Sequence, residues 1–102
     1  MLKIKIRKID GKYDKINLIG HADYANYGKD IVCAAASSIM TTTVNAIFIF
    51  DKTYITYENK KDNFMIKVNK NNEVVDNLIN NMLNMLKELE KDYPENIKIE
   101  EE

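Results

Sequence analysis

Residues 31–50 of the chain read IVCAAASSIMTTTVNAIFIF, a stretch that contains no charged residue. The alanines at 34–36 favour an α-helix, whereas the threonines at 41–43 oppose one through their restricted χ1 torsions. Apolar side chains occur on nearly all sides of this predicted helix, which indicates that more than one face is covered. We therefore expect a helix from Ile31 towards Phe48 or Phe50, with a sheet on one side and a partner subunit on another.

The same stretch is long enough to span a bilayer. Hydroxyl and amide side chains interrupt it, however, and no tryptophan or basic flank marks a membrane interface. We interpret it as a helix buried inside a soluble protein and expect no membrane partner. Residues 1–6 alternate instead of forming the apolar core of a signal peptide, so no secretion signal is predicted.

Two strands are predicted on the N-terminal side of this helix. Apolar and basic residues alternate over residues 2–8, with the period of two that is typical of a half-buried strand. Residues 10–12 form a tight turn in which Gly11 can adopt a positive φ. Residues 13–19 then return as the second strand, and this places His21 at a strand end, a rigid platform for a functional side chain.

A second hairpin is predicted on the C-terminal side, with strands at residues 52–57 and 64–68 and a polar turn at 59–62. Residues 73–92 form the clearest helix, because apolar residues recur there at every third or fourth position. Pro94 ends this helix. Its predicted core face consists of Val75, Leu78, Ile79, Met82, Leu86, Leu89 and Tyr93.

A short last strand around Ile97 and Ile99 completes the order ββαββαβ. The length of 102 residues allows one domain with one modest core. The predicted fold class is therefore α+β, a single domain over residues 1–102 with a mixed or antiparallel sheet packed by two helices.

Composition and charge narrow the classes of function. Hydrophobic residues make up 45% of the chain and charged residues 30%, as in ordinary globular proteins. The net charge is −1, and Arg7 is the only arginine among 15 basic residues, although the guanidinium fork is favoured for binding phosphate. We therefore expect no direct nucleic-acid partner.

The only histidine and the only cysteine, His21 and Cys33, flank a short loop. A single cysteine cannot form an internal disulfide, and a free thiol fits the reducing cytoplasm. Asp30 is placed to cap a helix that begins at Ile31, which puts Cys33 in the first helical turn. The positive end of the helix dipole is expected to lower the thiol pKa there.

Cys33 and His21 together supply the chemistry of a cysteine peptidase. The thiol is the candidate nucleophile, and the imidazole accepts its proton and later donates a proton to the leaving amine. Unpaired backbone N–H groups in the first helical turn are candidate donors to the oxyanion. Ser37 lies one turn after Cys33 on the same helix face, where it either lines the site or bonds a backbone carbonyl.

Each of these residues also has a simpler interpretation. A cysteine among alanines, such as Cys33, is a common small core residue, and His21 is compatible with an ordinary polar position. Asp30 is more simply a helix cap than the orienting carboxylate of a triad. Tyr24 and Tyr27 either hold a substrate or pack against the protein.

No metal or cofactor is predicted. One cysteine and one histidine supply too few ligands for a zinc site, and the nearby aspartates lack the spacing of a metal-binding loop. Gly20 and Gly28 do not form a glycine-rich phosphate cradle. Gly28 is instead a candidate hinge for a loop that closes over a substrate.

Residues 20–37, GHADYANYGKDIVCAAAS, resemble the signature of the ribosomal-processing cysteine protease family called Prp. The matching positions are residues 20–22, Gly28, residues 30–35 and Ser37. An N-terminal hairpin ahead of the motif and a long C-terminal helix are also similar to that family in order and length.

The resemblance implies a cytoplasmic, homodimeric endopeptidase. The family substrate is the N-terminal extension of large-subunit ribosomal protein twenty-seven, cut after aromatic residues before the protein enters functional ribosomes. Carried over to this sequence, Cys33 is the nucleophile and His21 is the general base. Asp30 and Ser37 match motif positions as supporting residues.

The resemblance further implies that residues 22–29 are the loop that orders over the substrate peptide, with Tyr24, Tyr27 and Gly28 as candidate contributors. Two other classes of function stay open. A non-catalytic ribosome-assembly module would bind the precursor without cutting it. A thiol-based redox sensor would need a resolving cysteine, and this chain has none.

Overall fold

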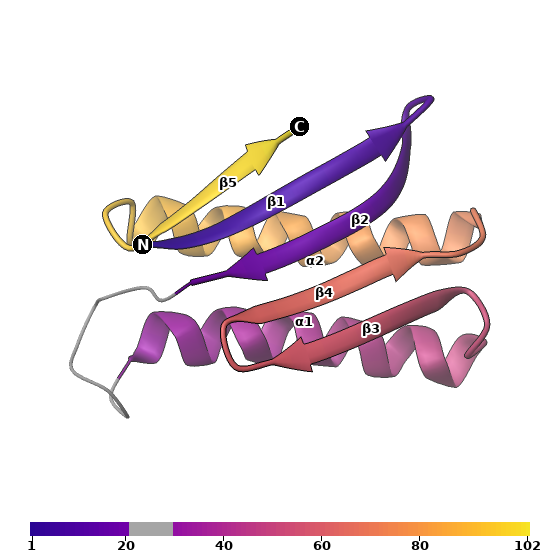
Figure 1. The fold of residues 1–102 in the computed structure, drawn as a ribbon, viewed down its shortest axis with the longest axis horizontal. Coiled ribbons are helices and arrows are strands. Elements are labelled where there is room, and N and C mark those ends of the chain that lie inside the picture. The colour runs from indigo at the N-terminus through magenta and orange to yellow at the C-terminus, as the bar shows by residue number, and fades with distance from the viewer. Residues whose placement is uncertain (21–29) are drawn as a thin grey trace.

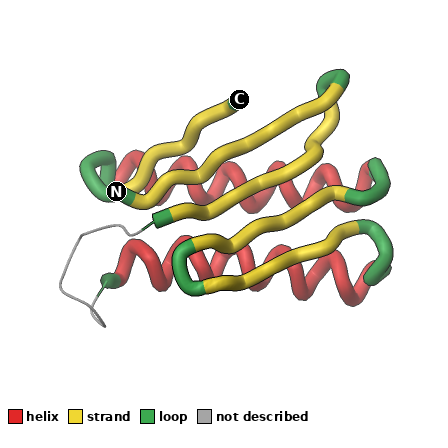
Figure 2. The backbone as a smooth tube through the Cα atoms, viewed as in Figure 1, coloured by secondary structure: helices red, strands yellow, loops and turns green. Residues whose placement is uncertain are grey.

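The computed structural model describes residues 1–20 and 30–102 and has the predicted element order ββαββαβ. The elements are β1 (Leu2–Ile9), β2 (Lys12–Ile19), α1 (Ile31–Phe50), β3 (Ile55–Lys60), β4 (Asn63–Val68), α2 (Glu73–Asp92) and β5 (Ile97–Glu101). Both helices lie on one face of a five-stranded sheet, and no described element covers the other face (Figure 1). Figure 2 shows the same two layers, with the helices in red and the strands in yellow.

The sheet is mixed, which decides between the two arrangements that the sequence allowed. Its strand order is β3-β4-β2-β1-β5. The pairs β1–β2, β2–β4 and β3–β4 are antiparallel, whereas β5 runs parallel to β1. The last strand is parallel because the chain returns along α2 across the sheet before it enters β5.

The β1–β2 hairpin turns through Asp10 and Gly11, whose φ angles are 53° and 76°. Positive φ at both central residues is the geometry that matches the right-handed twist of the flanking strands. A β-bulge follows, because Arg7 pairs with Lys15 while Lys8 pairs with Tyr13. The bulge adds one residue, Asp14, to β2.

The strand predicted at residues 52–57 is wrong in its bounds, since β3 covers Ile55–Lys60. The side chain of Asp51 accepts hydrogen bonds from the Thr53 N–H at 2.8 Å and from the Thr53 hydroxyl at 2.6 Å. This local turn delays the strand by three residues. The predicted turn at 59–62 correspondingly shortens to residues 61–62.

The core lies between the helices and the sheet. On α2, the predicted positions Val75, Ile79, Met82 and Leu86 are buried, as is Leu83, which the spacing argument omitted. The predicted positions Leu78, Leu89 and Tyr93 are partly buried against this core. On α1, the buried residues are Val32, Ala36, Met40, Thr43, Val44 and Ile47.

The opposite face of α1 is uncharged and exposed. Ile31, Ile49 and Phe50 are 51%, 88% and 45% exposed. By length and composition, α1 is the one helix among the described residues that would be able to cross a membrane. One face of α1 nevertheless belongs to the core that the sheet and α2 share.

Candidate active site

Asp30 caps α1 and thereby fixes the position of Cys33. Its backbone is extended, and its side-chain Oδ1 accepts a hydrogen bond from the Cys33 N–H at 2.9 Å. The Asp30 carbonyl accepts the next hydrogen bond, from the Ala34 N–H at 3.1 Å. The predicted N-cap is therefore confirmed, and Cys33 lies in the first helical turn.

This cap changes which backbone groups are available to a reacting carbonyl. The N–H of Cys33 already donates to Asp30, so it is not an unpaired donor as the sequence suggested. The N–H groups of Ile31 and Val32 make no hydrogen bond to another described residue. The first turn of a helix leaves such donors pointing out of its N-terminus.

The thiol opens on a small cavity between α1 and one end of the sheet. Its volume is about 40 Å³, and the β3–β4 turn forms one wall. Cys33 and Ser37 border it from α1, and Gly20 borders it from the end of β2. The other lining residues are Leu2, Leu18, Asn59, Lys60, Lys61, Asp62, Asn63 and Phe64.

A backbone hydrogen bond from Gly20 links the end of β2 to the β3–β4 turn. The N–H of Gly20 donates to the carbonyl of Asp62 at 3.1 Å. Its φ is 87°, and a Cβ atom here would lie 3.0 Å from the carbonyl oxygen of Met1. A larger residue would be strained at this position and would crowd the N-terminus, so glycine keeps the turn close to Cys33.

The pKa of the Cys33 thiol is raised, which contradicts the lowering expected from the helix dipole. Burial is the largest cause, and the negative charge of Asp30 adds to it. A hydrogen bond from the Ser37 side chain acts in the opposite direction, and the charge of Asp62 raises the pKa further. Both burial and nearby carboxylates disfavour the thiolate.

We expect the alkylation of Cys33 by iodoacetamide to have its midpoint above the ordinary thiol pKa of about 8.5. Asp62→Asn removes a negative charge and should lower this midpoint, whereas Ser37→Ala removes a hydrogen bond to the thiolate and should raise it. The measurement is the alkylation rate as a function of pH. The control is Asp10→Asn, at the far end of β1, which should leave the midpoint unchanged. Equal midpoints in all four proteins would contradict this electrostatic account.

The structure brings together three of the predicted site residues, Cys33, Asp30 and Ser37. The predicted base His21 and the predicted loop residues Tyr24, Tyr27 and Gly28 lie outside the described residues. Sequence reasoning missed the contribution of Asp62 and its neighbours in the β3–β4 turn. No local pattern marks these residues, because only the β2–β4 pairing brings them to Cys33.

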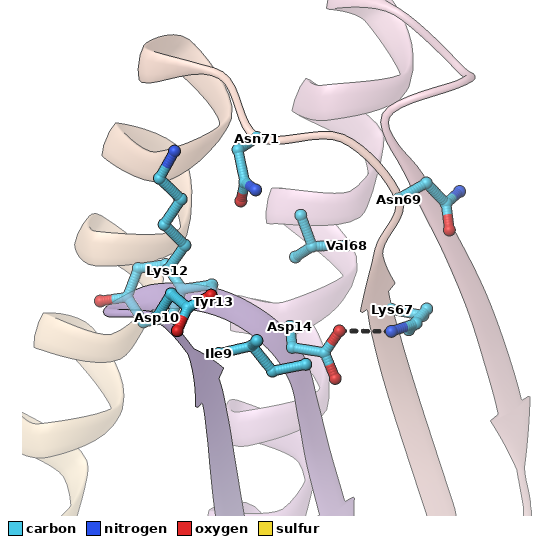
Figure 3. Close-up of a pocket in the computed structure, with 9 residues that line it drawn as sticks. All are labelled: Ile9, Asp10, Lys12, Tyr13, Asp14, Lys67, Val68, Asn69 and Asn71. Carbon is cyan, nitrogen blue, oxygen red and sulfur yellow. Dashed lines mark hydrogen bonds and ion pairs between the residues drawn. The ribbon is translucent and has the colours of Figure 1, made fainter.

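A larger cavity, of about 570 Å³, lies at the opposite end of the same strands (Figure 3). Its central acidic group, Asp14, accepts hydrogen bonds from Lys67 and from Arg7 Nε, the latter at 2.7 Å. These two hydrogen bonds are the main cause of the lowered pKa of Asp14. The lining contains no cysteine or histidine, and its central carboxylate, Asp14, is already paired, so we assign the chemistry to the smaller cavity.

Among the described residues, no group of three or more histidine, cysteine, aspartate or glutamate side chains is placed to hold a metal ion. The chemistry available at the described site is therefore that of one thiol beside a hydroxyl and two carboxylates. A thiol at the start of a helix, open to a cavity, is compatible with a cysteine nucleophile.

Comparison with known proteins identifies the family. A family model described as cysteine protease Prp matches residues 1–98. The chain belongs to the Prp family of cysteine proteases. It is 37% identical over 93 residues to the ribosomal processing cysteine protease Prp of Staphylococcus aureus, and the match covers 88% of each chain. The resemblance noted in residues 20–37 is thereby confirmed.

Two solved Prp structures share the fold. The chain superposes on an essential ribosomal processing protease Prp from S. aureus, in complex with a covalently linked product peptide, with a TM-score of 0.91 and 33% identity. A complex of S. aureus Prp with a substrate peptide gives a TM-score of 0.87 and 31% identity. Both matches cover 100% of each chain. The chain is therefore a Prp-type cysteine protease, a hydrolase with the Prp fold.

Proposed function

We propose that this protease removes the N-terminal extension of a large-subunit ribosomal protein, with Cys33 as the nucleophile and His21 as the general base. One observation carries the proposal. Cys33 is the only cysteine in a chain that belongs to a cysteine protease family, and it opens on a cavity at the start of α1.

The proposed reaction has two steps. In the first, His21 takes the thiol proton as Cys33 Sγ bonds to the scissile carbonyl carbon, and the C–N bond then breaks as His21 returns the proton to the leaving amine. In the second, water attacks the thioester while His21 accepts its proton. The C–S bond breaks, the carboxylic acid leaves, and Cys33 regains its proton.

The raised thiol pKa explains why this site needs a base. Burial and the charges of Asp30 and Asp62 raise the pKa of the Cys33 thiol and so favour its protonated form. A protonated thiol is a weak nucleophile. Proton removal in the attacking step therefore becomes the task of His21, while Ser37 stabilises the thiolate by its hydrogen bond.

The oxyanion of the tetrahedral intermediate needs hydrogen-bond donors. The N–H groups of Ile31 and Val32 are the donors still available in the first turn of α1, because the Cys33 N–H already donates a hydrogen bond to Asp30. Their position at a helix N-terminus favours a developing negative charge. We assign oxyanion stabilisation to these two groups.

The choice of substrate is supported by the relatives. The curated S. aureus relative is a ribosomal processing enzyme, and S. aureus Prp has been solved with a substrate peptide and with a covalently linked product peptide. Within the Prp family, large-subunit ribosomal protein twenty-seven is the expected precursor. A precursor of this kind places the reaction in the cytoplasm, where a free thiol is stable.

We expect the protein to cut an N-terminally extended precursor of that ribosomal protein at a single peptide bond after an aromatic residue. The measurement is mass spectrometry of the products, with the mature-length protein as the control that should stay intact. Stable complex formation without cleavage would instead identify a non-catalytic assembly module. Cleavage of both proteins at many sites would contradict a processing function.

We further propose that the protein is a homodimer through the exposed face of α1. Ile31 lies at the start of this helix and Ile49 and Phe50 lie at its end, and the exposed side chains between them are uncharged and mostly small. A charge at its most exposed position should oppose burial of that surface. We expect the mass in solution, measured by light scattering, to be that of a dimer for the parent and of a monomer for Ile49→Lys. The matched control is Val74→Lys, at an exposed apolar position of α2, which should remain dimeric.

A further inference from the structure

The net charge of −1 is the sum of a helix layer that is net acidic and strands that are net basic. In the helix layer, α2 carries the acidic residues Glu73, Asp76, Glu88, Glu90 and Asp92 against the basic residues Lys87 and Lys91, and α1 carries no charge. The strands, in contrast, contain more basic than acidic residues. The expectation drawn from net charge alone therefore does not describe the surface of the sheet.

Strand register shows where the basic side chains lie. Arg7 pairs with Lys15, and Lys15 pairs with Lys67, so these three residues form one row across β1, β2 and β4. The isoleucines beside them in each strand are buried against the helices. Because side chains alternate between faces, the row lies on the open face of the sheet, which no described element covers.

A second row lies at the other end of the strands, where Lys3 pairs with Lys98 of β5. Lys5 lies between the two rows on β1, on the same face. We call this surface the basic sheet face. Its basic residues are Lys3, Lys5, Arg7, Lys15, Lys60, Lys67 and Lys98, and its acidic residues are Asp14, Glu58 and Glu100.

Several of these positive charges are not neutralised by an ion pair among the described residues. Lys3, Lys5, Lys15 and Lys98 make no ion pair with a residue that the structure describes. Arg7 and Lys67 share the single carboxylate of Asp14, so these three side chains together keep a net positive charge. An array of unpaired cations attracts a polyanion and releases its counterions.

The chemistry of the face favours a nucleic-acid backbone over an acidic protein. Lysine is a flexible, strongly hydrated point charge that is depleted in the cores of protein interfaces. No residue on the basic sheet face is aromatic, so it offers no platform for the stacked bases of a single strand. Alternate residues along a strand are about 6.6 Å apart, so the basic side chains of β1 are regularly spaced on this face.

We propose that the basic sheet face binds the phosphate backbone of double-stranded RNA without reading its sequence. The choice of RNA rests on the proposed function, since a ribosomal protein is delivered to ribosomal RNA. Lys60 and Asn63 border both this face and the cavity at Cys33, so bound RNA would lie beside the protease site. The surface would thus hold the enzyme where its substrate is assembled.

The test is fluorescence anisotropy with a labelled RNA duplex of mixed sequence, titrated with the full-length protein at several salt concentrations. Lys3→Glu/Lys15→Glu should weaken binding at least tenfold and reduce the slope of log K against log salt by about 2, one for each lost phosphate contact. The matched control is Lys87→Glu/Lys91→Glu on α2, which changes the net charge equally and should retain the parent affinity and slope.

Lys3→Gln/Lys15→Gln adds no negative charge and should reduce the slope by the same amount. This second variant still tests the proposal if charge reversal unfolds the first. All variants should cut a short peptide at the parent rate, so failure of RNA binding is distinguishable from failure of proteolysis. Absence of binding by the parent at low salt would overturn the proposal. An equal loss in both charge-reversal variants, or tighter binding of polyglutamate than of RNA, would overturn it as well.

Discussion

Cys33→Ala is expected to abolish peptide cleavage, with kcat/KM falling by roughly 10⁴–10⁶-fold, the range that loss of a covalent nucleophile produces. The chain has no second thiol to form the acyl-enzyme, because Cys33 is its only cysteine. Alanine is the best helix former, and the side chain is only partly buried, so the fold should persist. The measurement is the initial rate of cleavage of a fluorogenic precursor peptide.

A matched control lies on the same helix. Ser38→Ala makes a change of similar size at an exposed position of α1 and should keep the parent rate. Circular dichroism of both variants should match the parent, which separates loss of the nucleophile from loss of structure. Cleavage at the parent rate by Cys33→Ala would show that the thiol is not the nucleophile.

His21→Ala should lower kcat/KM by roughly 10²–10⁴-fold, the usual contribution of a general base. The raised thiol pKa makes this loss large, because the protonated thiol then lacks its acceptor. The parent should lose activity as pH falls, because protonated His21 cannot accept a proton. The variant should lack this acidic limb, and its rate should rise with pH as the thiol itself ionises.

Added imidazole provides a control for the role of His21. It should partly restore cleavage in His21→Ala and leave Cys33→Ala inactive, because it replaces the base and not the nucleophile. The measurement is the pH–rate profile of each protein with and without imidazole. An acidic limb that persists in His21→Ala would assign the base to another group.

Most of the fold is predictable from local patterns. The alternation in residues 2–8 and the three-to-four spacing in residues 73–92 correspond to β1 and α2, because each pattern decides which side chains are buried. The start of β3 is not predictable in this way, since the Asp51 turn competes with β-propensity. The parallel pairing of β5 with β1 depends on how α2 crosses the sheet.

The candidate site, like the fold, is only partly predictable from local sequence. The Asp30 cap and the placement of Cys33 in the first turn follow from neighbouring residues, and both are confirmed. The direction of the thiol pKa shift does not follow from them. Its largest cause is burial, which depends on tertiary structure; the charge of the neighbouring Asp30 adds to it, and Asp62 of the β3–β4 turn contributes less.

The most direct test of the proposed mechanism is to trap the acyl-enzyme. The precursor peptide is mixed with the protein, the reaction is quenched in acid within its first turnover, and the intact mass is measured before peptide mapping. We predict one acyl group per chain, attached to Cys33 and absent from Cys33→Ala. Cleavage that proceeds with no acyl group on Cys33, or with the group on another residue, would contradict the mechanism.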